Sequence, residues 1–211
     1  MAVNNESAYD LQQLAATASK SEADAIRLFM ACLLDCRSNG RRRPRQTDWS
    51  VVQCQLRCLL LKLPNRFTFN FLYICERTEK TGDSEEYIMN YSYSKGSRTF
   101  SPFLSAHQVN STLEILLACG FFVKKVVTKG QVLQSTLILL RRLQAYEVPS
   151  LQGSCFAIIR SRLPIPVTDE VLSKTRLPKI LYQDITREGL LTEIMDKIHE
   201  SESLTRIAEY Y

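Results

Sequence analysis

Hydrophobic residues recur with a helical period over the first part of the chain. Between residues 21 and 36 they fall three or four positions apart, and Gly40 then provides a natural helix end. A second stretch with the same period covers residues 48–62 and ends before a proline. The pattern predicts a helical hairpin that follows a loose segment at residues 1–20.

Alternation of apolar and polar residues replaces this period in the next segment and predicts two strands. The aromatic residues at every second position of the first strand are Phe67, Phe69, Phe71 and Tyr73. Tyrosine and methionine alternate in the same way over residues 87–93, beyond a polar loop. We expect an antiparallel hairpin. Aromatic side chains on a sheet beside basic residues could stack unpaired bases, but an alternating strand needs one apolar side, so the phenylalanines are expected to face the core.

A helix with a capping box is predicted at residues 105–119. Ser105 and Gln108 form the box, and a glycine follows the last apolar position. Apolar stretches at residues 121–127 and 132–140 lie on either side of a Lys-Gly turn. We expect these two stretches to form a second hairpin.

The last third of the chain returns to a helical pattern. Residues 155–160 are first predicted as a fifth strand, and helices follow from Thr168. Thr186 is expected to cap a helix that reaches His199, and a short helix is expected from Ser203. The predicted fold class is therefore α+β: an N-terminal helical hairpin, an antiparallel sheet of about five strands with a packed helix, and C-terminal helices.

Charge is distributed unevenly along the chain, whose net charge is +5. Residues 1–166 carry 21 Lys and Arg against 13 Asp and Glu, whereas residues 167–211 carry 6 against 9. We expect a basic α+β core domain at residues 21–166 and an acidic helical segment at residues 167–211 packed on it. A basic body with an acidic tail suits a polyanionic partner, although a solvated charged surface gives the same counts.

The densest run of positive charge lies between the two predicted N-terminal helices. Its members are Arg37, Arg41, Arg42, Arg43 and Arg45. Guanidinium groups bind phosphate oxygens in pairs, and a turn lets several of them reach one phosphate backbone. We predict that this loop binds nucleic acid, either RNA or DNA, in a salt-dependent manner. The same run would suit anionic lipid headgroups or a nuclear import signal.

A second basic cluster is predicted on the later hairpin. It comprises Lys124, Lys125, Lys129, Arg141 and Arg142. A helix followed by a hairpin is loosely similar to the recognition helix and wing of a winged-helix module. The helix at residues 105–119 contains no Lys or Arg, which favours a helix of the core.

Tyrosines of the second strand are the next candidates for ligand contacts, because a tyrosine tolerates exposure and its hydroxyl can bond phosphate. The secondary contacts expected are Tyr87, Tyr91 and Tyr93, together with Lys95 and Arg98.

Two Cys-x-x-x-Cys pairs flank the arginine run, Cys32 with Cys36 and Cys54 with Cys58. This spacing places both thiols of a pair on one helix face, and four thiolates suit a structural zinc ion. The same positions lie on the stripes that a helical hairpin buries, so buried thiols are the favoured interpretation and no cofactor is expected. Cysteines in apolar surroundings and an N-terminus without a secretory pattern predict a reducing compartment, cytoplasmic or nuclear.

No motif in the sequence indicates catalysis. The two histidines lie outside any nucleophile or zinc-protease motif, and the seven glycines are scattered singly. We expect a non-enzymatic polyanion-binding protein, with viral accessory or regulatory proteins as one such class. The alternative is a self-associating, matrix-like scaffold that binds anionic membrane and partner proteins, and that assembles through its sheet or C-terminal helices. A third interpretation is a protein-interaction adaptor that uses the helices of residues 168–211.

Overall fold

The computed structural model describes residues 25–26, 28–30, 33, 49–63, 67–76, 86–93, 96–99, 104–145, 150–164, 167 and 169–208. The chain divides into two compact units. The first comprises Met1–Cys32, Pro44–Asn65 and Pro149–Met195, and the second comprises Leu33–Arg43, Arg66–Val148 and Asp196–Tyr211. Each unit therefore takes residues from both the predicted basic core and the predicted acidic segment.

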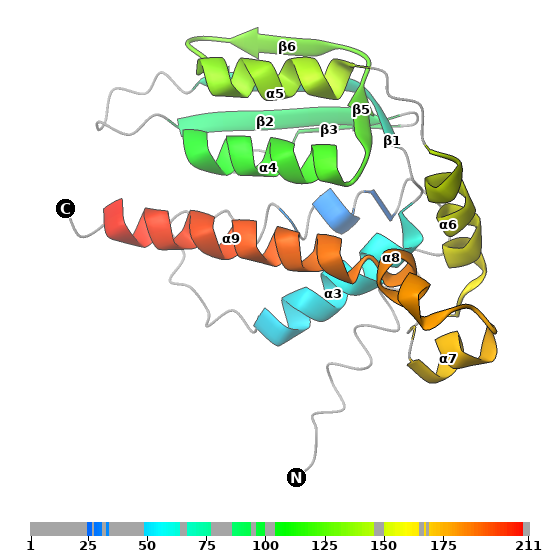
Figure 1. The fold of residues 1–211 in the computed structure, drawn as a ribbon. Coiled ribbons are helices and arrows are strands. Elements are labelled where there is room, and N and C mark those ends of the chain that lie inside the picture. Colours follow the sequence, from blue (N-terminus) through cyan, green and yellow to red (C-terminus); the bar gives the residue numbers. More distant parts are fainter. Residues whose placement is uncertain are drawn as a thin grey trace. The chain divides into compact units, whose positions relative to one another are not determined.

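The predicted α+β class is confirmed (Figure 1). The described elements are α3 (Trp49–Lys62), β1 (Phe67–Glu76), β2 (Glu86–Tyr93), β3 (Gly96–Thr99), β4 (Leu104–Ser105), α4 (Ala106–Ala118), β5 (Phe121–Val123), β6 (Val126–Lys129), α5 (Gln134–Gln144), α6 (Leu151–Arg162), α7 (Asp169–Lys174), the 3₁₀-helix η1 (Lys179–Leu181), α8 (Tyr182–Thr186) and α9 (Glu188–Ala208).

The elements described in the first unit are helices, and the segment predicted as a fifth strand at residues 155–160 belongs to one of them, α6. The Ser150 side chain accepts a hydrogen bond from the Gly153 amide at 3.0 Å and begins this helix. Phe156 and Ile159 then pack against a cluster formed by Leu163, Leu172 and Ile185. Their spacing of three positions fits a helix. The short apolar run was therefore compatible with a strand or a helix, and the packing of these side chains against the cluster selects the helix.

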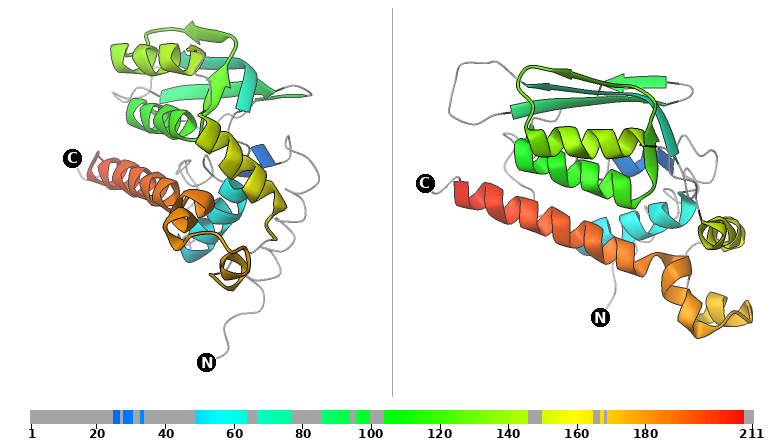
Figure 2. Two further views of the ribbon diagram at one scale, coloured as in Figure 1. Left: turned by 45° about the vertical axis from the view of Figure 1, so that its right-hand side comes forward. Right: turned by 45° about the horizontal axis from the view of Figure 1, so that its top comes forward.

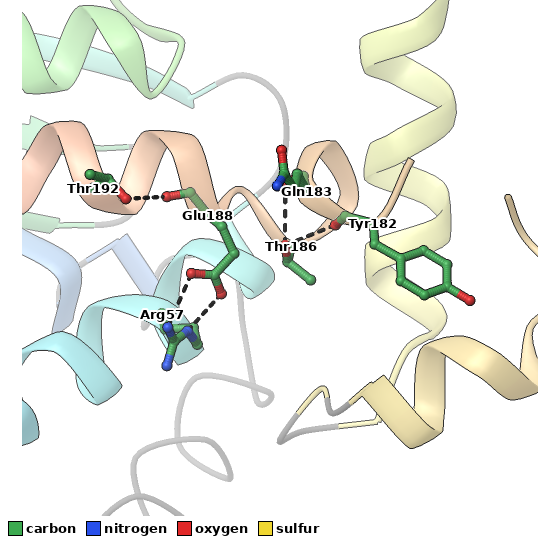
Figure 3. Close-up of polar contacts among 6 residues, drawn as sticks. All are labelled: Arg57, Tyr182, Gln183, Thr186, Glu188 and Thr192. Atoms are coloured by element: carbon green, nitrogen blue, oxygen red, sulfur yellow. Dashed lines mark hydrogen bonds and ion pairs between the residues drawn. The ribbon is translucent and has the colours of Figure 1, made fainter. Parts of the chain in front are cut away.

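The junction of α8 and α9 differs from the prediction (Figure 3). The Thr186 hydroxyl donates to the Tyr182 carbonyl at 2.8 Å inside α8, so this threonine does not cap the next helix. Arg187 follows with a left-handed φ of 58°, and Glu188 begins α9. That helix continues through 21 residues, where two separate helices were predicted.

The second unit contains a sheet with the strand order β3-β2-β1-β5, in which β6 also pairs with β1. The predicted hairpin of β1 and β2 is confirmed as an antiparallel pair. Strands β5 and β6 both pair with β1 in parallel, so the sheet is mixed.

The second predicted hairpin is wrong because residues 134–144 form helix α5. The buried residues of α5 are Thr136, Leu139, Leu140 and Leu143. Their spacing of three, one and three positions is helical, and the nearly continuous apolar run had concealed it.

Helix α4 is confirmed with its cap. The Ser105 hydroxyl accepts from the Gln108 amide at 3.3 Å, and the Gln108 side chain accepts from the Ser105 amide at 2.9 Å. Gly120 follows the helix with φ of 80°, a conformation that glycine adopts without strain.

A β-bulge in β1 changes which side chains enter the core. The pairing with β2 shifts between Phe69 and Phe71, which leaves Asn70 as an extra residue. Phe67 and Phe69 are buried before the bulge, whereas Leu72 and Ile74 are buried after it, so the alternation changes phase. The predicted single stripe is therefore wrong: Phe71 and Tyr73 lie on the opposite face of the sheet.

Candidate nucleic-acid interface

The predicted basic cluster lies in the second unit, on consecutive elements. Lys124 and Lys125 form the break between β5 and β6, and both side chains are exposed. The Lys124 amide donates to the Phe69 carbonyl and the Lys125 carbonyl accepts from the Leu72 amide, each at 2.9 Å. In a regular strand neighbouring side chains take opposite faces, so this interruption allows both lysines to reach solvent.

The remaining cations of the cluster follow along the chain. Lys129 is exposed at the end of β6, and Arg141 and Arg142 are exposed in the last turn of α5. No Asp or Glu occurs in residues 115–146, where these five cations are found. All charged side chains of the segment itself are therefore cationic, while the Glu76 carboxylate of β1 accepts a hydrogen bond from the Gln131 amide beside them. The two arginines are also favoured at their position by the negative end of the helix dipole.

Tyr87 and Tyr91 do not have the exposure expected of ligand contacts. Their side chains are buried, and the Tyr87 hydroxyl donates to the Gln131 carbonyl at 3.3 Å. Together with Met89 they form the core-facing stripe of β2, because alternation places every second side chain on the same face. Of the other secondary candidates, Lys95 lies outside the described residues, and only the backbone of Tyr93 and Arg98 is described.

Polar side chains of α4 form hydrogen bonds within the fold. The Asn110 amide nitrogen donates to the Ser135 hydroxyl at 2.9 Å, and its oxygen accepts from the Thr136 hydroxyl at 2.5 Å. Gln108 belongs to the helix cap. Because α5 replaces the hairpin that would have been a wing, the loose similarity to a winged-helix module does not hold.

Two aromatic rings lie on the face of the sheet opposite the core. Phe71 and Tyr73 are half-buried, and their rings are nearly parallel, with centroids 6.2 Å apart and an interplanar angle of 10°. Helices α4 and α5, which belong to the same unit, lie on the other side of the sheet (Figure 2). A hydrogen bond to Cys75 raises the pKa of the Tyr73 hydroxyl above its ordinary value, so this phenol stays protonated to a higher pH than a free tyrosine does.

Strand β6, which pairs with β1, extends the face of the sheet that carries the two rings. In the parallel pairing Val127 lies beside Tyr73 and Lys129 lies beside Cys75. On the opposite flank, β2 places Ser92 beside Phe71 and Asn90 beside Tyr73. Paired residues share a face of the sheet, so aromatic rings, polar groups and a terminal lysine occur together.

The arginine run Arg37, Arg41, Arg42, Arg43 and Arg45 lies outside the described residues, as do Cys32 and Cys36. Cys54 and Cys58 are half-buried on α3. Burial, and then the neighbouring Cys54, raises the pKa of the Cys58 thiol, which favours the protonated form over the thiolate that a metal requires. Within the described residues no group of three or more potential ligands could hold a metal ion.

Comparisons with known proteins give no match among protein-family models, curated proteins or solved structures. Among the described helices, none has both the length and the apolar character needed to cross a membrane.

Proposed function

We propose that this protein binds nucleic acid through the cationic segment formed by β5, β6 and α5. The observation that supports the proposal is the grouping of five exposed cations in a segment without an acidic residue. Lysines and arginines of this kind bind phosphates and release the counterions condensed on them. The predicted arginine run at residues 37–45 would add further phosphate contacts.

A salt titration tests this proposal. Binding of a labelled single-stranded RNA, a DNA duplex and anionic liposomes would be measured over a series of salt concentrations, for the wild type and for Lys124→Ala/Lys125→Ala and Arg141→Ala/Arg142→Ala. Each lost phosphate contact should reduce the slope of log affinity against log salt by about 0.7–0.9. Lys174→Ala is the matched control, because this exposed lysine lies in the other unit and pairs with Glu170 at 2.5 Å.

The result is decisive in both directions. Nucleic-acid binding with a steep slope that falls in the two double variants, and not in the control, supports the proposal. Absence of binding to RNA and DNA, or slopes that are equal in all variants, overturns it.

A self-associating scaffold is the second candidate, and exposed apolar residues on α6 favour it. The side chain of Leu151 is 82% exposed and that of Ile158 is 64% exposed. The two residues are seven positions apart, so they lie on the same side of α6. Exposed apolar surface of this kind suits contact with another protein. This candidate predicts concentration-dependent oligomers in light scattering that Ile158→Glu reduces, together with liposome binding in the titration above. A monomer at every concentration would rule it out.

A further inference from the structure

We propose that the face of the sheet that carries Phe71 and Tyr73 binds single-stranded nucleic acid, with unpaired bases stacked on these two rings and phosphates held by Lys129 of β6 and by Lys124 and Lys125 at the break between β5 and β6. This inference rests on the proposed function and deepens it, because it assigns the kind of nucleic acid and the contacts to its bases.

The first support is the position of the rings. A buried alternating strand needs only one apolar face, and β1 already supplies Phe67, Phe69, Leu72 and Ile74 to the core. The bulge at Asn70 then directs Phe71 and Tyr73 to the other face, where their nearly parallel rings are partly accessible. Aromatic rings on a sheet surface offer π-faces on which unpaired bases stack, whatever the base.

The second support is charge complementarity around the rings. Lys129 of β6 pairs with Cys75, so it lies on the face of the sheet that also carries Tyr73. Lys124 and Lys125 are exposed at the break between β5 and β6, along the same edge of the sheet. A polymer that laid its bases on the central strand could therefore place its phosphates along the cationic edge. Asn90 and Ser92, on the opposite flank, add an amide and a hydroxyl next to the rings.

The arrangement favours single strands over duplexes. The bases of a duplex are stacked on one another, and their faces cannot contact a side chain unless the helix is opened. A sheet surface with aromatic rings and a charged edge matches unpaired bases and their backbone.

The test uses the full chain and separates stacking from charge. Affinity for a labelled oligo(dT) of about 12 nucleotides would be measured by anisotropy over a salt series, beside a duplex of equal length. Phe71→Leu and Tyr73→Leu retain apolar volume without a π-face, whereas Phe71→Tyr and Tyr73→Phe retain the π-face. We expect each leucine variant to bind about 5- to 150-fold more weakly with an unchanged salt slope, and each aromatic variant to bind like the wild type.

A second readout does not depend on affinity. Ultraviolet crosslinking to oligo(dT) should label the tryptic peptide of residues 67–77, which Arg66 and Arg77 delimit and which contains both rings. Circular dichroism of each variant would establish that it is folded.

The outcomes distinguish the two proposals. Weaker binding by the leucine variants, preference for single strands and a crosslink in residues 67–77 support the inference. Binding of the leucine variants equal to the wild type, or equal affinity for the duplex, overturns the inference and leaves the cationic segment as the interface. Failure of the wild type to bind any nucleic acid overturns both.

Discussion

The turn between β6 and α5 should not tolerate a side chain at Gly130. This glycine has φ of 83°, and a Cβ built on it would lie 2.6 Å from Oε2 and 2.7 Å from Cβ of Glu76. The same Oε2 accepts a hydrogen bond from the Gln131 amide at 2.6 Å. The Gly130→Ala substitution therefore imposes a strained backbone and also displaces a bonded carboxylate.

The cost follows from these two effects. A left-handed conformation costs a residue with a Cβ about 1–2 kcal/mol. Loss of a hydrogen bond to a charged group costs about 1.5–3 kcal/mol, and the lower end applies because this bond is exposed. The free energy of unfolding should thus fall by about 3 kcal/mol, which for a chain of this length lowers Tm by about 6–12 °C.

Urea denaturation and thermal melts of the purified protein provide the measurement. Gly189→Ala is the control, because a Cβ at this position in α9 meets nothing within 4 Å and should change the free energy by at most about 1 kcal/mol, towards stability. In Glu76→Gly/Gly130→Ala the steric part is removed, because the Cβ of residue 76 is lost together with its carboxylate, and the backbone part should remain relative to Glu76→Gly alone. A Gly130→Ala protein within about 0.5 kcal/mol of the wild type would refute this reasoning.

Three further predictions concern single interactions. Ser105→Ala should lower the free energy of unfolding by about 0.5–2 kcal/mol through loss of the α4 cap, and an unchanged melting curve would contradict it. Exposed Cys155 should react with maleimide before Cys58, because the raised pKa of Cys58 favours its unreactive thiol form, and peptide mapping at several pH values would reveal which cysteine reacts first. The contribution of Cys58 to the free energy of unfolding should decline above its ordinary pKa of 9.0, where the thiol loses its proton in the unfolded chain but keeps it in the folded one. Arg57 and Glu188 form an ion pair with two hydrogen bonds, and their side chains are 38% and 39% exposed. Glu188→Gln should therefore lower the free energy of unfolding by no more than about 1 kcal/mol. A larger loss in urea denaturation would show that solvent screens this ion pair less than expected.

Local sequence signals predicted those elements whose periodicity has only one interpretation. Helix α4 begins at a capping box and ends before Gly120, and both signals act within a few residues. Helix α3 and the hairpin of β1 and β2 were predicted for the same reason, since each has a clear period and a defined end.

Short, continuously apolar runs were assigned wrongly because their period is ambiguous. Residues 134–144 and 155–160 fit a strand or a helix equally well. The burial of Leu139, Leu140 and Leu143 selects the helix in the first segment, and the packing of the half-buried Phe156 and Ile159 selects it in the second. Parallel pairing of β5 and β6 with β1 could not be predicted, because it depends on contacts between residues more than fifty positions apart.

The candidate site was predicted in part. Lys124, Lys125 and Lys129 were identified from charge alone, and all three are exposed. The aromatic pair was assigned to the core, although the strand contained a contrary signal: Leu72 and Ile74 alternate with Phe71 and Tyr73 and offer a second apolar stripe. Which stripe enters the core depends on the bulge, and tertiary pairing with β2 sets its position.

The extra residue in β1 decides which of two apolar stripes enters the core, so the faces of this strand depend on the position of the bulge as well as on composition. Deletion of Asn70 would leave Phe69 and Phe71 as neighbours in a regular strand, so Leu72 and Ile74 would still point inward and Phe71 and Tyr73 outward. If Asn70 instead joined the regular pairing, strict alternation from Phe69 would turn Phe71 and Tyr73 inward in place of Leu72 and Ile74. Loss of this one residue should therefore change the surface of the strand less than a change that keeps the chain length and removes the bulge.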